Sequence, residues 1–228
     1  MTRAYDKDYL PGAMSRLGHM MNYAEDCLGM DVAVFYRLFL SSGIADAFGL
    51  GHPRFIAGLS GCELARLVIT STSDLELPLG PEEPFQPLDA FWAGWSLAYF
   101  QWYTALPFRF LETHGLDIET VLGLYNPLHE ADITKFIDVG LDRIRQWQKA
   151  HPSPLKTLRK AIGVTQAELA ERTGVSLRMI RAYEQGTQDI SKAESASVFR
   201  LANALGTDAV MLQTLGPAEL EASAKTAP

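Results

Sequence analysis

The sequence predicts an all-α protein with an N-terminal helical domain in residues 1–150 and a smaller C-terminal helical bundle in residues 151–216. Apolar residues recur every three or four positions along most of the 228 residues, which is the period of an amphipathic helix. Ser, Thr or Asp begins many of these stretches, and glycine often follows them, as expected of helix caps. The sequence His-Pro-Ser-Pro at 151–154 separates two parts that are each long enough to form a core.

The first half of the N-terminal domain is predicted to contain three main helices. Gly29 ends the first of them, and Asp31 caps the second. Frequent Gly and Pro residues predict short helices and turns over 44–61. Ser60 and Glu63 form a predicted capping box at the start of the third helix. The inward positions of the first helix are Met14, Leu17, Met21, Ala24 and Leu28.

Residues 73–89 interrupt the pattern, because four prolines lie among acidic residues, and we predict an exposed acidic loop. The aromatic helix that follows is predicted to be the central helix of the domain. Its run of apolar residues, 91–106, contains polar residues and is shorter than the about 20 needed to span a bilayer, so no membrane helix is expected. One stripe of this helix carries Trp92, Trp95, Tyr99, Trp102 and Leu106.

Two further helices complete the domain. A short one is predicted over 117–124, and a longer one from His129 to about Lys149. The longer helix ends near Ala150, because proline lacks an amide hydrogen and restricts the residue before it, and Pro154 can begin the next helix. The inward positions of the longer helix are Ile133, Ile137, Ile144 and Trp147.

The second domain contains two short helices joined by a tight turn. Thr165 and Glu168 form a capping box that starts the first helix. Gly174 accepts the left-handed backbone that ends it, and Ser176 caps the second. The second helix turns Ile180 and Tyr183 inward and carries Leu177, Arg178, Arg181 and Ala182 on its opposite side. Two arginines on one exposed face indicate an anionic partner.

Residues 155–215 resemble the helix-turn-helix domain of the XRE family, the phage-repressor and Cro-like DNA-binding proteins. The resemblance implies a five-helix bundle whose third helix enters the major groove. Ser191 and Glu194 form a predicted capping box for the fourth helix, Asp208 caps the fifth, and 217–228 is predicted to be disordered. The residues in register with the family are Gln166, Leu169, Ala170, Gly174, Ile180, Tyr183, Glu184 and Gly186.

The partner expected from this resemblance is double-stranded DNA. Arg178 can donate two parallel hydrogen bonds to guanine, worth about 1–3 kcal/mol of discrimination, and Leu177 can contact a thymine methyl group. Arg181, one turn along, can reach a base or a phosphate. The resemblance implies that Gln166 contacts a backbone phosphate, helped by the helix N-terminus. The further phosphate candidates are Ser176, Thr187 and Lys192.

The resemblance also implies an ion pair and an oligomeric state. Arg159 on the first helix of the bundle should face Glu184 at the end of the third and fix its angle. Family members usually bind pseudo-palindromes as dimers, so a homodimer is expected, joined through the first domain or through the last helices. Repression is the expected direction of control.

The charge is divided between the two domains. Residues 1–150 hold 11 Lys and Arg against 19 Asp and Glu, a net charge of −8, whereas residues 151–216 hold 8 against 6, a net charge of +2. The tail brings the total to −7. A duplex is therefore repelled by the first domain and accepted by the second.

Three hypotheses remain for the first domain, which is similar to helical domains joined to XRE modules in bacterial proteins. It is a sensing and dimerisation domain with a small-molecule effector, the partner-binding half of an antitoxin that meets a toxin-like protein, or an enzyme. Only His129, Glu130 and Asp132 form a local cluster that could ligate a metal, and we expect no catalytic residue, metal or cofactor.

The N-terminal residues and the cysteines indicate where the protein acts. The first residues lack the apolar core of a signal peptide, so a cytoplasmic protein is expected. Cys27 and Cys62 are interpreted as inert thiols of a reduced protein, with a redox switch as the alternative.

Overall fold

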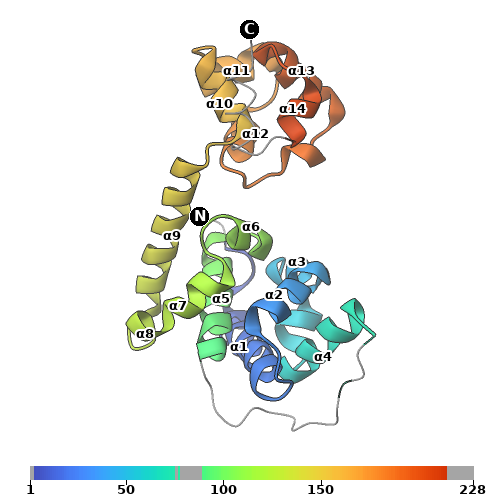
Figure 1. Cartoon of the computed structure of the whole chain (residues 1–228), viewed down its shortest axis with the longest axis vertical. Coiled ribbons are helices and arrows are strands. Elements are labelled where there is room, and N and C mark those ends of the chain that lie inside the picture. Colours follow the sequence, from blue (N-terminus) through green and yellow to red (C-terminus); the bar gives the residue numbers. More distant parts are fainter. Residues whose placement is uncertain (1–2, 75–76, 78–88, 215–228) are drawn as a thin grey trace. The chain divides into compact units, whose positions relative to one another are not determined.

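A computed structural model describes residues 3–74, 77 and 89–214 of the chain (Figure 1). These residues form helices joined by turns, with no strand among them, so the all-α prediction is confirmed. The chain divides into two compact units, Met1–Ile144 and Arg145–Pro228. The acidic loop predicted over 73–89 falls almost wholly outside the described residues, and so does the tail from 217.

The first part of unit 1 follows the predicted caps. The Asp31 carboxylate accepts a hydrogen bond from the amide of Val34 at 2.9 Å. Ser60 and Glu63 form the predicted capping box, since each side chain accepts from the other residue's amide. The elements are η1 (Lys7–Tyr9), α1 (Leu10–Asp26), α2 (Val32–Ser41), α3 (Ile44–Gly49), the π-helical segment η2 (Arg54–Gly58) and α4 (Gly61–Thr72).

The aromatic helix α5 (Asp89–Thr104) is central to unit 1 and packs along α1. The two helices approach closely at Gly94, where an added Cβ would lie 2.5 Å from the carbonyl oxygen of Leu17. Small residues of α5 line this crossing, and of the predicted aromatic stripe only Trp102 is buried. Trp92, Trp95 and Tyr99 are only partly buried. The fully buried apolar residues of α5 are Ala90, Ala93, Leu97, Ala98 and Phe100.

The rest of unit 1 corrects one predicted boundary. The helix expected to begin at His129 begins at Ile133 instead. Asp132 supplies the cap, because its carboxylate accepts from the amide of Thr134 at 2.8 Å and from the Thr134 hydroxyl at 2.6 Å. The elements are α6 (Phe108–Thr113), α7 (Ile118–Gly123), α8 (Tyr125–Leu128) and α9 (Ile133–Ala150).

Three histidines end helices in the same way, which the sequence did not reveal. Each ring stacks on the aromatic side chain four residues earlier, and its Nδ1 lies 3.0 Å from the carbonyl oxygen of that residue. The ring nitrogen thus adds a second contact to a carbonyl of the last helical turn, since the carbonyls of Tyr125 and Trp147 also accept from the backbone amides of His129 and His151 at 2.8 Å. The pairs are Phe110–His114, Tyr125–His129 and Trp147–His151, with ring centroids 3.9, 4.6 and 4.5 Å apart.

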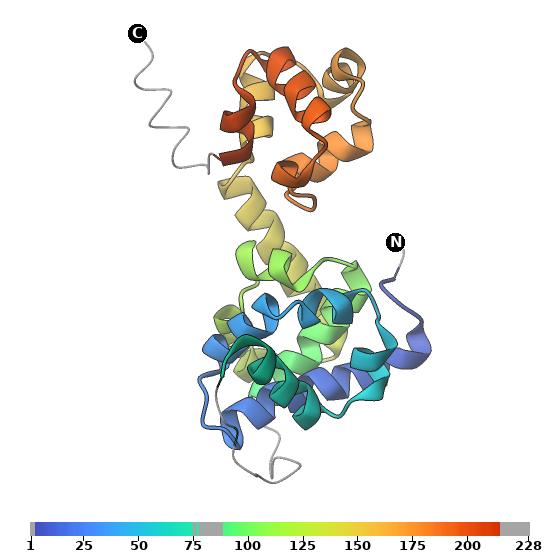
Figure 2. The same cartoon turned by 90° about the vertical axis from the view of Figure 1, so that its right-hand side faces the viewer.

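Unit 2 is the predicted five-helix bundle (Figure 2). Its core is formed by Leu155, Leu169, Val175, Ile180, Tyr183, Leu201, Ala202, Leu205 and Leu212. Its elements are α10 (Pro154–Ala161), α11 (Gln166–Thr173), α12 (Leu177–Glu184), η3 (Ile190–Lys192), α13 (Ser195–Leu205) and α14 (Ala209–Thr214). Pro154 is at the start of α10, as predicted, and Ser153 caps it by accepting from the amide of Lys156 at 3.2 Å.

Two features of unit 2 differ from the sequence analysis. The capping box expected from Ser191 and Glu194 is wrong, because Glu194 precedes α13 without a side-chain cap and the Ser191 hydroxyl donates to Asp189, which caps η3. The unit also begins at Arg145, before the boundary drawn at 150/151. The end of α9 joins it, since Gln148 Nε2 donates to the carbonyl oxygen of Gln185 at 2.9 Å.

We predict that Gly94→Ala lowers the free energy of unfolding of unit 1 by about 1–3 kcal/mol, because the added methyl group meets the backbone of α1. Chemical denaturation followed by circular dichroism measures the change. Gly123→Ala in α7 is the matched control, since nothing lies within 4 Å of its added Cβ. Its unfolding free energy should stay the same or rise by up to about 1 kcal/mol. Equal stability of the two variants would show that the α1–α5 approach tolerates a side chain.

Candidate nucleic-acid interface

The helix pair α11–α12 is built from local signals. Thr165 and Glu168 form the predicted capping box of α11, with their reciprocal hydrogen bonds at 3.1 and 2.7 Å. Gly174 adopts the left-handed conformation, with φ of 66°, and ends the helix. Ser176 then caps α12 by accepting from the amide of Met179 at 3.3 Å. Two short helices are thus joined by the expected tight turn.

The two faces of α12 differ in burial and charge. Ile180 is fully buried and Tyr183 is 8% exposed, so both belong to the core. Arg178 and Arg181 are exposed to the solvent. The N-terminal half of α12 therefore presents a guanidinium outward while its inner face is fixed by packing.

A buried ion pair holds the end of α12 against α10. Arg159 Nε and Nη2 donate to the two carboxylate oxygens of Glu184 at 2.5 and 2.9 Å, and Nη1 donates to the carbonyl oxygen of Val164 at 2.8 Å. The hydrogen bond to Glu184 raises the pKa of the Arg159 guanidinium. Both side chains are nearly removed from solvent, with exposed fractions of 10% for Arg159 and 2% for Glu184. This bidentate geometry fixes the direction of α12 relative to α10.

Gln166 is part of the same network. Its Nε2 donates to the Glu184 carboxylate at 2.7 Å, so its side-chain amide is engaged within the bundle. Thr187 is likewise engaged, because its hydroxyl donates to the carbonyl oxygen of Ala182 at 3.2 Å. Ser176 and Lys192 are exposed, and Leu177 is partly exposed. The structure therefore places the expected contact residues around α12, with Gln166 and Thr187 turned toward protein groups.

Sequence reasoning missed Gln148, whose amide contacts the residue that follows α12. It lies in α9, which was predicted to belong wholly to the first domain. The only signal was its place two residues before the end of a helix, beside the proline-rich boundary. That signal does not distinguish a linker from part of the bundle.

The polar groups singled out in unit 1 do not form a metal site in the structure. His129 Nε2 lies 3.7 Å from Glu130, while its Nδ1 faces the carbonyl oxygen of Tyr125 and Asp132 caps α9. Within the described residues, no group of three or more His, Cys, Asp or Glu could hold a metal ion. None of the described helices is long and apolar enough to cross a membrane.

Neither cysteine forms a disulfide. Cys62 is buried and Cys27 is partly buried. Burial raises the pKa of the Cys27 thiol, with a smaller contribution from the neighbouring carboxylate of Asp26. A raised pKa reduces the thiolate fraction, which is the reactive form.

Comparison with known protein families finds a match for the segment that contains α11 and α12. Residues 155–212 match a family model described as helix-turn-helix. The match covers the segment whose residues resemble the XRE family, so that resemblance is confirmed for the C-terminal domain. Comparisons with curated proteins and with solved structures found no match. At this general level the protein is a DNA-binding transcription regulator.

We predict that Glu184→Ala destabilises unit 2 by about 3–5 kcal/mol, because it leaves the Arg159 guanidinium buried without its partner. Thermal and urea unfolding measure this loss. Glu171→Ala removes an exposed carboxylate of α11 and should change stability by no more than about 0.5 kcal/mol. If both variants unfold like the original protein, the ion pair does not hold α12 in place.

Proposed function

We propose that this DNA-binding transcription regulator, whose residues 155–212 form an XRE-type helix-turn-helix domain, is a cytoplasmic repressor that binds a pseudo-palindromic operator as a homodimer. The observation that carries the proposal is the pair of exposed arginines on α12, a helix whose other face is fixed by the core and by Glu184. An exposed cationic face on a firmly held helix suits insertion into a DNA groove.

Base recognition is assigned to the N-terminal half of α12. Arg178 is the second residue of the helix and is exposed, so it can form two parallel hydrogen bonds with guanine. Leu177 is partly exposed and can contact a thymine methyl group. Arg181 lies nearly one turn further and is assigned to a phosphate, because base edges are approached by the first turn.

Phosphate contacts position the domain on the duplex. The Gln166 side chain is bound to Glu184, so we assign its phosphate contact to the backbone amide at the N-terminus of α11. Lys192 is exposed and contributes a second contact, with the Ser176 hydroxyl beside the base-reading turn. The Thr187 hydroxyl can donate to a phosphate only if it gives up its hydrogen bond to the carbonyl oxygen of Ala182.

The division of charge supports this orientation. Unit 1 holds 9 Lys and Arg against 19 Asp and Glu, a net charge of −10, whereas residues 145–214 hold 10 against 6, a net charge of +4. DNA attracts the second unit and repels the first. The acidic unit 1 is therefore free to meet another partner while unit 2 is on DNA.

For unit 1 we propose a sensing role, through a small-molecule effector. The alternative is an antitoxin, in which unit 1 binds a basic, toxin-like protein and unit 2 represses the operon. The net charge of −10 on unit 1 favours the antitoxin alternative, because an acidic unit associates faster with a basic protein. Co-purification separates the two, since a stoichiometric protein indicates an antitoxin and a bound small molecule indicates a sensor. We assign no enzymatic activity to the chain.

We predict that Arg178→Ala with Arg181→Ala reduces the preference for a selected duplex over a scrambled one by about 1–3 kcal/mol, because the bidentate base contact is lost. Fluorescence anisotropy against both duplexes measures the preference. Arg172→Ala with Arg200→Ala is the control, since it removes the same charge from exposed positions on α11 and α13 and should keep the preference. An unchanged preference in the Arg178 and Arg181 variant contradicts the assignment of α12.

We predict that the homodimer forms through the last helices, because Phe199 on α13 is 60% exposed. Exposed aromatic rings are typical anchors of protein interfaces. Phe199→Glu should produce a monomer in light scattering without changing thermal stability. Arg200→Glu, at the neighbouring exposed position, is the control. A wild-type protein that remains monomeric with and without operator DNA rules out the dimer.

A further inference from the structure

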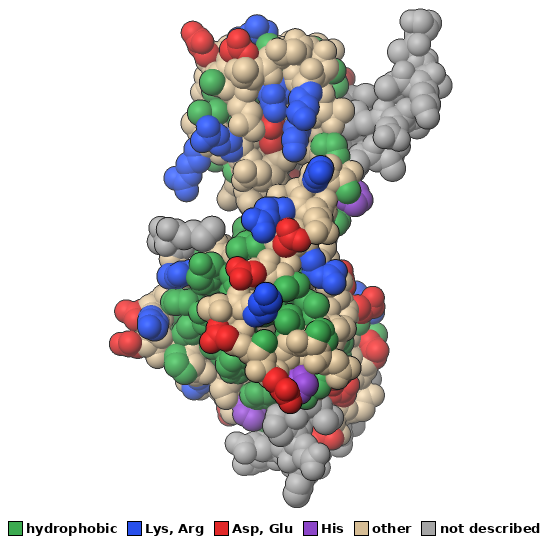
Figure 3. Space-filling model, turned by 90° about the vertical axis from the view of Figure 1, so that its left-hand side faces the viewer, with side chains coloured by type: hydrophobic (Ala, Val, Ile, Leu, Met, Phe, Trp, Pro, Cys, Tyr) green, Lys and Arg blue, Asp and Glu red, His purple; other side chains and the backbone are tan. Residues whose placement is uncertain are grey.

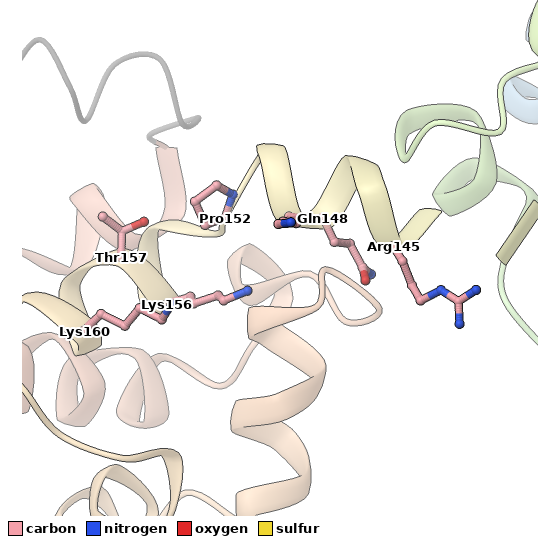
Figure 4. Close-up of a pocket in the computed structure, with 7 residues that line it drawn as sticks. Arg145, Gln148, Pro152, Lys156, Thr157 and Lys160 are labelled. Carbon is pink, nitrogen blue, oxygen red and sulfur yellow. The ribbon is translucent and has the colours of Figure 1, made fainter. Parts of the chain in front are cut away.

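A basic hollow opens on unit 2 where α9 ends and α10 begins. Its volume is about 460 Å³, and four of its seven lining residues carry positive charge, while none is acidic. The cations are Arg145 and Lys149 from α9, and Lys156 and Lys160 from α10. Figure 4 shows Lys156 and Lys160 extending from α10 and Arg145 extending from α9. The other lining residues are Gln148, Pro152 and Thr157.

The positive charges of the basic hollow are concentrated by the helical repeat. Arg145 and Lys149 are four residues apart on α9, and Lys156 and Lys160 are four residues apart on α10, so each pair lies on one face of its helix. Like charges at this spacing repel each other. Within the described part of the chain, no carboxylate pairs with Lys149, Lys156 or Lys160. A bound anion would relieve this repulsion.

The basic hollow is attached to the end of the recognition helix. Gln148, which lines it, donates to the carbonyl oxygen of Gln185, the residue that follows α12. The last residues of α9 therefore belong to the DNA-binding unit. They raise its net charge from +2 for residues 151–214 to +4 for residues 145–214. Figure 3 shows several Lys and Arg side chains on the face of this unit that it presents, with a few Asp and Glu side chains among them.

The residues of the basic hollow favour an extended phosphate chain over an enclosed small molecule. Arg145, Lys149, Thr157 and Lys160 are all exposed. Small-molecule sites usually bury most of the ligand against apolar side chains, whereas Pro152 is the only apolar residue in this lining. Flexible lysine side chains suit phosphates, because a phosphate is bound by positive charge and does not require the bidentate donor geometry of a guanidinium.

We propose that the basic hollow binds backbone phosphates of the same duplex that α12 contacts, so that the DNA-binding surface extends beyond the helix-turn-helix domain to the end of α9. This inference rests on the proposed function. It adds to that function a set of contacts that carry affinity but no base preference. Neutralising these contacts therefore weakens binding to all sequences equally, unlike a change in Arg178.

The test is the triple variant Lys149→Gln, Lys156→Gln and Lys160→Gln. The logarithm of its binding constant is measured against the logarithm of salt concentration, with a selected duplex and a mixed-sequence duplex. Each lost phosphate contact reduces the slope by about 0.9, so we expect a reduction of about 2 to 3 on both duplexes. The ratio of the two affinities should be retained. Thermal unfolding checks that the variant is folded.

The matched control carries the same loss of charge in unit 1, as Lys7→Gln, Lys135→Gln and Arg143→Gln, all of which are exposed. The slope of its salt dependence should fall by less than the about 0.9 that corresponds to one phosphate contact. If the hollow variant behaves like this control while the Arg178 and Arg181 variant loses base preference, the proposed function holds and the inference about the hollow is wrong. If the wild-type protein binds no duplex, both are wrong.

A third measurement identifies a soluble ligand. Inorganic triphosphate is titrated calorimetrically into the wild-type protein and into the hollow variant. Triphosphate binding that is lost in the variant, together with an unchanged salt slope on DNA, assigns the hollow to a soluble anion and overturns the duplex assignment. If triphosphate competes with both duplexes for the wild-type protein, but competes less effectively for the variant, the result supports the duplex assignment.

Discussion

The buried ion pair between Arg159 and Glu184 is the interaction on which the DNA-binding unit depends. It joins the first and third helices of the bundle through two parallel hydrogen bonds, and Val164 and Gln166 complete the network. Burying two charges is costly, so their attraction and hydrogen bonds offset desolvation only when the geometry is good. The same requirement gives α12 one favoured direction, and therefore fixes where Arg178 and Arg181 emerge.

The two units are stabilised by different means. Unit 1 depends on close helix packing, in which Gly94 lets α5 approach the backbone of α1 and small residues occupy the buried face. Unit 2 has a smaller core and adds a polar network to it. A small domain buries less apolar surface. Polar contacts that fix the angles between helices therefore contribute more to specifying the fold of such a domain. Their opposite charges are consistent with separate partners.

The end of α9 alters how the surface of the DNA-binding unit is defined. A boundary drawn at the prolines leaves the lysines of α10 as scattered solvated charges. Once Gln148 attaches the end of α9 to the loop after α12, the same lysines share the lining of the basic hollow with two further cations, Arg145 and Lys149. Proline marked where one helix stops, but it did not mark where the compact unit begins.

Local signals in the sequence determined the caps and the turn of the helix pair. Thr165 with Glu168, Ser60 with Glu63, and the left-handed Gly174 act within a few residues, so spacing alone predicts them. The inward Ile180 and Tyr183 follow from the helical period in the same way. Resemblance to a family added the pairing of Arg159 with Glu184, which no local pattern contains.

Only the tertiary structure decided the partners of side chains that had several local options. Gln166 is bound to Glu184 rather than directed outward, Asp132 rather than His129 starts α9, and Gln148 joins the bundle. The buried face of α5 consists mainly of small residues because α1 lies against it, although the aromatic stripe was the stronger sequence pattern. The physical reason is distance along the chain. Caps and helical faces depend on neighbouring residues, whereas the partners of these side chains depend on which segments, distant in the sequence, pack against them.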